Sequence, residues 1–372
     1  MCIRDSLTSM AIVPKNISDT LQRILYPGSD KNIVELEMVQ EIRIAGKRIS
    51  FSLIFQKEDD PAIRPVSEAC TDEIRREYGN DCEVAITPKS SARMAPPVLP
   101  GVKNIIAIAS GKGGVGKSTM AVNLAVALAN RGAKVGLVDA DIFGPSIPKM
   151  FGEEDSHPYF EKIDGRDRIV PIEKFGVKFL SIGFFAKKDD ALIWRGPVAS
   201  NALKQLMMDG NWGELDFLLV DLPPGTSDIH LTLVQTVAVT GAVIITTPQD
   251  VALADVVKGV SMFNSKSINV PVLGIIENMS WFTPEELPEN KYYIFGKDGG
   301  KDLAAKMDLP LLGQVPLVMS IREGADSGLP AAVNEESATG IAFGDLAEEL
   351  IVQLERRNIY FKPTEKVKVR RR

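Results

Sequence analysis

The chain has 372 residues, of which 45% are hydrophobic and 25% are charged, and these are ordinary values for a folded globular protein. At about 150 residues per domain, this length predicts two or three domains. The 43 basic and 49 acidic residues give a net charge of −6, which excludes a general polyanion binder, so we expect no nucleic-acid partner. Three cysteines provide no disulfide framework and no apolar run reaches the ~18 residues of a membrane span, so we expect a cytoplasmic protein without stable membrane association.

Residues 89–102 mark the clearest boundary, because the run PKSSARMAPPVLP that begins at Pro88 resists both helix and sheet. Such a composition is typical of a semi-rigid linker. The sequence therefore predicts five segments, which are a disordered leader at 1–15, a small α+β domain at 16–88, the linker at 89–102, an α/β domain at 103–356 and a basic tail at 357–372.

Hydrophobic periodicity gives the elements of the two domains. In the small domain it predicts helices at 17–25 and 65–78 and a hairpin of strands at 33–44 and 47–55. In the larger domain it predicts apolar strands at 104–110, 133–141, 216–221, 242–247 and 270–276, separated by helices at 118–130, 197–209, 227–239 and 253–263. Apolar strands that alternate with helices predict an α/β fold whose mostly parallel sheet is covered by helices on both faces.

One glycine-rich segment, between the first strand and the first helix of the larger domain, matches the P-loop pattern GxxxxGK[ST]. Glycines let backbone N–H groups surround a phosphate, Lys117 supplies a cation, and Ser118 can bind Mg²⁺. We therefore expect ATP to bind at the whole segment, which consists of Gly111, Lys112, Gly113, Gly114, Val115, Gly116, Lys117, Ser118 and Thr119.

Carboxylates end two of the predicted strands. Asp139 and Asp141 follow one apolar strand, and Asp221 ends another in the pattern that holds Mg²⁺ in P-loop proteins. Ligands bind at the carboxyl ends of parallel strands, so we expect Ser118, Asp139 and Asp221 to hold Mg²⁺. The turn after Asp221 contains Gly225, whose N–H is expected to contact the γ-phosphate and to act as a switch.

The chain resembles the Mrp/ApbC-type iron–sulfur cluster carrier ATPases, which are MinD/ParA-like P-loop NTPases, from about Asn16 to about Arg356. The resemblance rests on GKGGVGKST at 111–119, VDADIFGPSIPKM at 138–150, WRGP at 194–197, VDLPPGTSDIHLTLVQ at 220–235, TTPQDVAL at 246–253, IENMSWF at 276–282, YIFG at 293–296 and GQVPL at 313–317. The upstream YPGSDKNIVELEMVQEI resembles the PaaD/SufT-like domain found at the N-terminus of many of these carriers.

This resemblance implies a slow, dimer-dependent ATP hydrolase. In the MinD/ParA branch a lysine placed like Lys112 crosses to the partner's phosphate in a nucleotide-sandwich homodimer, so Lys112 and Lys117 are expected to be catalytic. Asp141 is implied to orient the attacking water and Asn278 to hydrogen-bond the adenine. The implied cargo is an iron–sulfur cluster, taken from a donor and delivered to client apoproteins.

The expected cluster ligands are missing. The family usually has a Cys-x-x-Cys between the NMS and YIFG segments, but residues 281–292 hold no cysteine, and neither does the small-domain loop at 55–65. Iron in such clusters is normally held by thiolates. We expect Cys70 to be an inert packed thiol, whereas Cys82, flanked by two acids, is expected to be exposed and is the remaining candidate ligand for a transient cluster.

Three features receive no chemical role. His230 is expected to be structural, the segment Trp194–Pro197 is expected to be a loop that feeds a helix, and the helix predicted at 341–354 is followed by the basic tail, which we expect to be solvated.

Three functions remain open at this stage. The first is an ATP-hydrolysing carrier of iron–sulfur clusters. The second is a MinD/ParA-like positioning switch that binds a membrane or DNA through the basic tail. The third is a cluster-free assembly scaffold, for which the missing cysteines argue.

Overall fold

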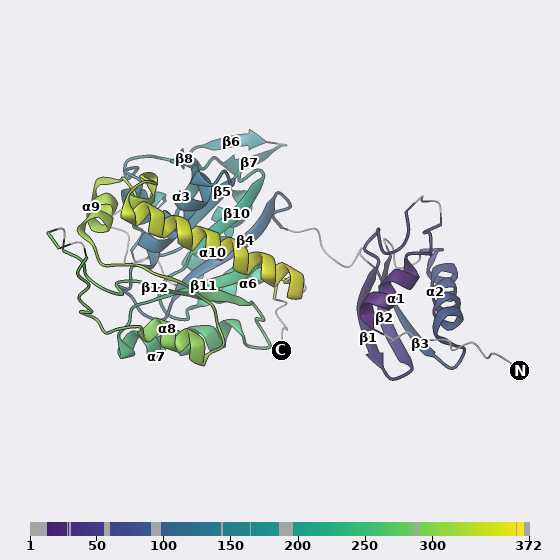
Figure 1. Cartoon of the computed structure of the whole chain (residues 1–372). Helices are drawn as coiled ribbons and strands as arrows, with labels where there is room; N and C mark the ends of the chain where they lie inside the picture. Colours follow the sequence, from purple (N-terminus) through teal and green to yellow (C-terminus); the bar gives the residue numbers. More distant parts are fainter. Residues whose placement is uncertain are drawn as a thin grey trace, which may run out of the picture. The chain divides into compact units, whose positions relative to one another are not determined.

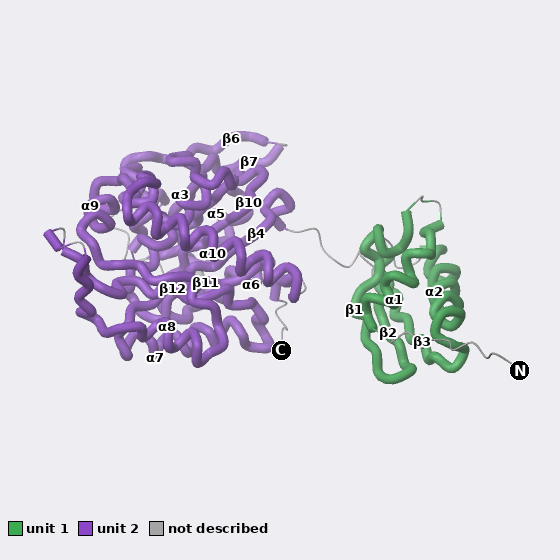
Figure 2. Tube along the Cα trace, viewed as in Figure 1, with its two compact units in different colours: residues 1–96 green, residues 97–372 purple. Residues whose placement is uncertain are grey.

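The computed structural model describes residues 13–27, 29, 31–55, 60–90, 98–142, 144–163, 165–185, 196–284, 286–287, 289–361 and 363–367. The chain divides into two compact units, Met1–Pro96 and Pro97–Arg372 (Figure 2). Most of the expected leader lies outside the described residues, and the first helix begins at Pro14. Among the described residues, no helix is long and apolar enough to cross a membrane.

Unit 1 packs two helices with a three-stranded sheet of order β1-β2-β3. Its elements are α1 (Pro14–Leu21), β1 (Val39–Ala45), β2 (Arg48–Phe55), α2 (Ile63–Tyr78) and β3 (Glu83–Ser90). The predicted hairpin is present, but β1 starts later than expected because residues 33–37 form turns, in which Asn32 Oδ1 accepts hydrogen bonds from the backbone N–H groups of Val34 and Glu35. Strand β3 begins directly after Cys82, and it pairs with β2 in parallel.

Unit 2 contains an eight-stranded sheet of order β13-β12-β11-β4-β10-β5-β9-β8 (Figure 1). Strand β8 is antiparallel to β9, and the other neighbouring pairs are parallel. The predicted mostly parallel sheet is thus confirmed. Its strands are β4 (Val102–Ser110), β5 (Val135–Asp139), β8 (Ile172–Lys174), β9 (Val177–Ser181), β10 (Leu215–Asp221), β11 (Gly241–Thr246), β12 (Val272–Glu277) and β13 (Leu311–Gln314), and β6 (Phe160–Ile163) and β7 (Arg166–Ile169) form a separate hairpin.

Both faces of this sheet are covered, as predicted, because alternate residues of its strands enter two different cores. On β4, Ile105, Ala107 and Ala109 join a core with residues of α5, α6 and α7, while Ile106 and Ile108 join another with residues of α3 and α10. The helices are α3 (Lys117–Asn130), α4 (Ile147–Met150), α5 (Gly196–Asp209), α6 (Asp228–Thr236), α7 (Asp250–Phe263), α8 (Gly299–Lys306), α9 (Met319–Ser327) and α10 (Ala338–Tyr360).

The C-terminal end departs from the expected tail. Helix α10 continues to Tyr360 and the side chain of Arg357 is buried, so the tail does not start at residue 357. The N–H of Val367 donates to the carbonyl of Val234 and the Val367 side chain packs on the core. Residues 363–367 therefore lie on unit 2, and residues 368–372 are outside the described part of the chain.

The topology gathers the carboxyl ends of three strands. Strand β4 leads through the P-loop and α3 to β5, and β10 lies between β4 and β5. In the parallel register Asp221 of β10 is paired with Ile108 of β4 and with Asp139 of β5. Ligands of open α/β sheets bind at such carboxyl ends.

Candidate active site

The P-loop surrounds an open pocket at the end of β4. Gly114 and Gly116 both have φ of +81°, a left-handed conformation that side chains rarely adopt. A Cβ on Gly116 would also collide with Asn278 Nδ2, so a larger residue there would displace the Asn278 amide in addition to straining the backbone. The cavity has a volume of about 220 Å³ and is lined by Ser110, Lys112, Gly113, Gly114, Gly116, Lys117, Ser118, Thr119, Asp141, Ser146, Met150 and Pro224.

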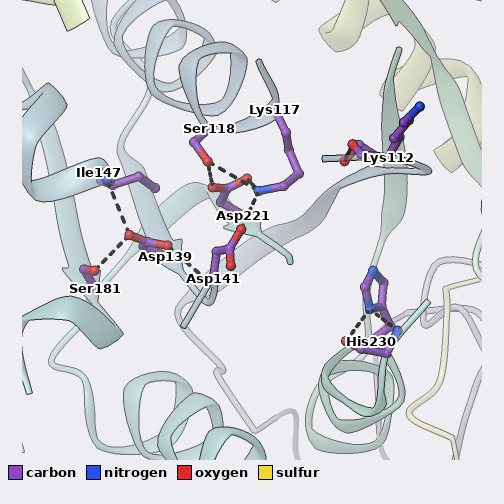
Figure 3. A network of polar contacts seen from close by, with 11 residues as sticks. Lys112, Lys117, Ser118, Asp139, Asp141, Ile147, Ser181, Asp221 and His230 are labelled. Atoms are coloured by element: carbon purple, nitrogen blue, oxygen red, sulfur yellow. Dashed lines mark hydrogen bonds and ion pairs between the residues drawn. The ribbon is translucent and has the colours of Figure 1, made fainter. Parts of the chain in front are cut away.

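Lys117, Ser118 and Asp221 form the centre of the site (Figure 3). Lys117 Nζ lies 2.6 Å from Asp221 Oδ1, and Ser118 Oγ donates to Asp221 Oδ2 over 2.5 Å. Lys117 is 6% exposed and Asp221 is fully buried. Burial raises the pKa of Asp221, and the Lys117 ammonium and these hydrogen bonds oppose that rise. A buried charge pair of this kind persists only while each charge has a partner.

Asp141 and Lys112 reach the pocket from two other positions. Asp141 Oδ2 lies 3.8 Å from Lys117 Nζ, so the carboxylate that we expect to orient water points into the pocket. Lys112 is exposed on the pocket wall. An exposed lysine in this place is accessible to a second molecule, and its catalytic role stays a prediction.

Asp139 is the predicted magnesium ligand that the structure places differently. It is fully buried and does not line the pocket. Its carboxylate accepts hydrogen bonds from Ser181 Oγ at 2.8 Å and from the backbone N–H groups of Asp141 at 3.1 Å and Ile147 at 3.4 Å. Burial and the nearby Asp221 charge raise the pKa of Asp139 to about 7. In this arrangement Asp139 fixes the start of α4 and the backbone of Asp141 rather than facing a metal ion.

Four other predicted residues are not on the pocket wall, and these are Gly111, Val115, Gly225 and Asn278. Asn278 Nδ2 donates to the carbonyl of Val115 at 2.9 Å, so its amide nitrogen is engaged by the P-loop itself. The N–H of Gly225 donates to the carbonyl of Ser110 at 2.9 Å. A Cβ on Gly111 would collide with the backbone of Asp255, which shows how closely the P-loop approaches α7.

The oxygen atoms around Lys117 fit magnesium. Mg²⁺ prefers hard oxygen ligands and is held in nucleotide sites by one or two side chains together with phosphates and water. Ser118 Oγ and Asp221 Oδ2 lie side by side next to the pocket and supply a hydroxyl and a carboxylate. Of the three predicted ligands, these two are in a position to share one ion.

Sequence reasoning missed four residues of the pocket. Ser110 precedes the motif, Ser146 and Met150 belong to the loop and short helix after Asp141, and Pro224 belongs to the turn after Asp221. Ser110 had a signal, because it ends the strand that feeds the P-loop. The other three lie within segments whose resemblance was noted, but no residue spacing indicated that these segments fold over the pocket.

The two cysteines that the structure describes, Cys70 and Cys82, do not form a ligand site. Cys70 is confirmed as a packed thiol, because it is fully buried on α2 and burial raises its pKa to about 12. Cys82 was expected to be exposed and is 2% exposed, because the position before β3 turns its side chain into the core of unit 1. Cys2 is outside the described residues. Among those that are described, no three His, Cys, Asp or Glu side chains gather to hold a metal ion.

The sequence matches the family described as NUBPL iron-transfer P-loop NTPase (ParA) over residues 101–351. The chain belongs to this family. It is 42% identical over 342 residues to the iron-sulfur cluster carrier protein of Synechocystis sp., and this match covers 90% of the chain and 96% of the relative. It is 48% identical over 259 residues to the iron-sulfur cluster transfer protein NUBPL of Dictyostelium discoideum, which covers 69% of the chain and 78% of the relative.

A solved structure supports the same assignment. The nucleotide-binding protein of Archaeoglobus fulgidus, solved in complex with ADP, is similar to this chain with a TM-score of 0.55 and 35% identity. The similarity covers 66% of this chain and 93% of that one. The resemblance to the cluster carrier ATPases and the P-loop NTPase fold are thus confirmed, and the chain is an NTPase of this family.

Proposed function

We propose that the chain is an ATP-hydrolysing carrier that binds iron–sulfur clusters and transfers them to apoproteins. The observation that carries this proposal is the convergence of Lys117, Ser118 and Asp221 at the P-loop of a chain whose relatives are named cluster carrier and transfer proteins. The cluster is cargo in this proposal, and ATP with Mg²⁺ is the ligand of the P-loop.

The residues around the pocket divide the work of ATP binding and hydrolysis. Backbone N–H groups of the P-loop bind phosphate oxygens, and Lys117 exchanges the Asp221 carboxylate for a phosphate. Ser118 and Asp221 hold Mg²⁺, which shields phosphate charge when it is bound. Asp141 orients a water molecule next to Lys117, and Lys112 acts across the interface of a homodimer, where it balances charge on the transferring phosphoryl group.

A second function is favoured by the cysteines. Thiolates are the usual ligands of iron–sulfur clusters, and both described cysteines are buried in the core of unit 1. The chain would then act as an assembly scaffold, whose ATP cycle moves a cluster that is held by cysteines of the donor and the client. This function keeps the nucleotide chemistry and removes the cluster from the chain.

One experiment separates the two functions. The chain is incubated anaerobically with iron, sulfide and MgATP and is then desalted. Its iron content and visible absorption are measured, and it is mixed with an apo-ferredoxin. Retained iron that moves to the ferredoxin supports the carrier. If no iron is retained but the chain speeds ATP-dependent transfer from a separate cluster-loaded donor to the ferredoxin, the scaffold is supported. Absence of both activities would refute a role in cluster delivery.

A further inference from the structure

The loop at residues 222–227, which follows Asp221, is fixed by three hydrogen bonds. The N–H of Leu222 donates to Ile108 O at 3.0 Å, that of Gly225 to Ser110 O at 2.9 Å, and that of Ser227 to His230 Nδ1 at 3.2 Å. The bond of Leu222 continues the strand ladder. The other two depend on Ser110 and His230, to which neither the P-loop motif nor the resemblance assigns a role.

Ser110 connects this loop with the P-loop. Its carbonyl accepts from Gly225 N–H, and its hydroxyl donates to the carbonyl of Lys112 at 3.0 Å. The Ser110 side chain is 3% exposed, so water does not readily replace these bonds. The two loops also lie close together, because a Cβ on Gly113 would lie 3.7 Å from Pro224 Cγ. Ser110 thus contacts both Lys112 and Gly225, whose N–H is expected to contact the γ-phosphate.

His230 holds the other end of the loop. In a helix-capping box, Glu or Gln at the third helical position accepts a hydrogen bond from the N-cap N–H, and here His230 takes that place for Ser227. Because Nδ1 accepts, the proton of the neutral ring is on Nε2. The ring is 1% exposed and burial lowers its pKa to about 4, so it is neutral near pH 7.

The second ring nitrogen of His230, Nε2, distinguishes this residue from an ordinary packed side chain. Nε2 is buried and has no hydrogen-bond partner among the described residues. In Figure 3 the dashed lines from His230 run to one side of the ring, and the other nitrogen points away from them. An unpaired buried donor costs about 1–3 kcal/mol, which a purely structural apolar residue would avoid.

We propose that Ser110 and His230 are positioning residues that tie the 222–227 loop to the P-loop and to α6, so that the loop and the Lys112 segment move together when nucleotide binds. Gly225 N–H becomes available to a phosphate only when its bond to Ser110 breaks. The Ser110 hydroxyl is also bonded to the carbonyl of Lys112, so a shift of Ser110 when the first bond breaks moves the lysine segment as well. His230 holds Ser227 at the start of α6, so this end of the loop stays in place while the part around Gly225 moves. This inference rests on the proposed ATP hydrolysis.

The first test replaces the His230 acceptor. His230→Leu removes the bond to Ser227 and keeps an apolar side chain, whereas His230→Gln restores an acceptor that suits a capping box. We expect Leu to lower kcat about tenfold, as the loss of a supporting contact does at other sites, with the affinity for MgATP changed less than about threefold. We expect Gln to restore kcat. Unchanged turnover in His230→Leu would overturn the proposal, and so would a Gln variant that is as slow as Leu at equal thermal stability.

The second test uses Ser110 and stays informative if His230→Leu does not fold. Ser110→Ala removes the bond to Lys112, and Ser110→Thr keeps a hydroxyl. The matched control is Ser52→Ala in unit 1, because Ser52 is also 3% exposed and also donates a side-chain hydrogen bond. We expect Ser110→Ala to slow hydrolysis more than it weakens nucleotide affinity, and we expect Ser110→Thr to restore the rate of hydrolysis. Equal turnover in Ser110→Ala and Ser52→Ala would contradict the proposal.

These results are distinguishable from a failure of the proposed function. If the wild-type chain binds ATP and does not hydrolyse it under any condition that allows dimers, the proposed function fails. If the wild type hydrolyses ATP and the Ser110 and His230 variants match it, only the inference about positioning fails.

Discussion

In unit 2, Lys117 and Asp221 are almost completely buried and face each other beside an open pocket, whereas in unit 1 the equally buried Cys70 and Cys82 lie among apolar side chains. Burial is nearly the same in the two places, and the neighbours differ. A buried ion pair retains its charge and can exchange one partner for a phosphate or a metal ion. A thiol in an apolar core stays protonated, as the pKa of about 12 of Cys70 indicates, and therefore lacks the thiolate that binds metal.

The comparison teaches that residue type does not identify a functional group here. Cysteine is the usual ligand for iron–sulfur clusters, yet Cys70 and Cys82 serve here as small hydrophobic residues. Lysine and aspartate are usually on the surface, yet here they are buried because a ligand site needs them at the end of the sheet. The difference comes from whether a charged partner lies within hydrogen-bonding distance.

The strongest way to break this comparison is Lys117→Ala. The substitution removes the cation that is proposed to exchange Asp221 for a phosphate, and with it a charge-assisted contact that water does not replace at equal strength. It also leaves the Asp221 carboxylate buried without its partner, which lowers the free energy of unfolding by about 3–5 kcal/mol. We expect no MgATP binding by isothermal titration at concentrations that saturate the wild type. The control is Lys103→Ala, because Lys103 lies near the opposite end of β4 and pairs with Asp216 on the surface. Equal affinity in Lys117→Ala would refute the P-loop assignment.

The next prediction sharpens the role of the two residues on the pocket wall. Asp141→Ala should bind MgATP and hydrolyse it about a hundredfold or more slowly, because only the water-orienting carboxylate is removed. Light scattering on this variant with ATP should show a dimer. Lys112→Ala should also lose hydrolysis, with nucleotide affinity largely kept. A monomer at micromolar concentration in the first variant would contradict action of Lys112 across an interface.

A smaller effect is expected from His230, a buried base without a charged partner. Its pKa is about 4 in the folded chain, against 6.5 for an ordinary histidine. Above pH 6.5 the ring is neutral in both the folded and the unfolded state. As the pH falls from 6.5 towards 4, the ring takes up a proton in the unfolded state and stays neutral in the folded state. The group therefore lowers the free energy of unfolding by about 2 kcal/mol between pH 7 and pH 5. Denaturant unfolding of wild type and His230→Gln at both pH values measures this, and equal pH dependence would show that the ring is not buried as described.

The smallest effect is expected for the cysteines. Cys70→Ser and Cys82→Ser, alone and together, should leave the iron content after anaerobic reconstitution unchanged, because neither thiol is accessible in the folded chain. In the wild type both should react with a thiol reagent only after denaturant is added. Loss of stably bound iron in Cys82→Ser would instead show that unit 1 opens to form a cluster site.

The sequence by itself determined the local parts of the site. The P-loop could be predicted because its chemistry is contained in nine consecutive residues, and the sheet could be predicted because apolar strands alternate with helices. It also indicated that Asp221 would lie at the same edge of the sheet as the P-loop, because parallel strands bring their carboxyl ends to one edge. The direct contact of Asp221 with Lys117, 104 residues away, was found only in the structure. The strands at 160–181 were missed because they are short and mostly lack a clear apolar run.

Only the tertiary structure decided which of two similar aspartates contacts the P-loop. Asp139 and Asp221 both end apolar strands and are direct neighbours in register. Strand β9 lies beside β5 and supplies Ser181, which hydrogen-bonds to Asp139, while Asp221 accepts from the P-loop. The same holds for Cys82, whose acidic neighbours suggested exposure, and for the link from Ser110 to Gly225. Each of these outcomes depends on contacts between residues distant in sequence, and a local pattern carries no information about them.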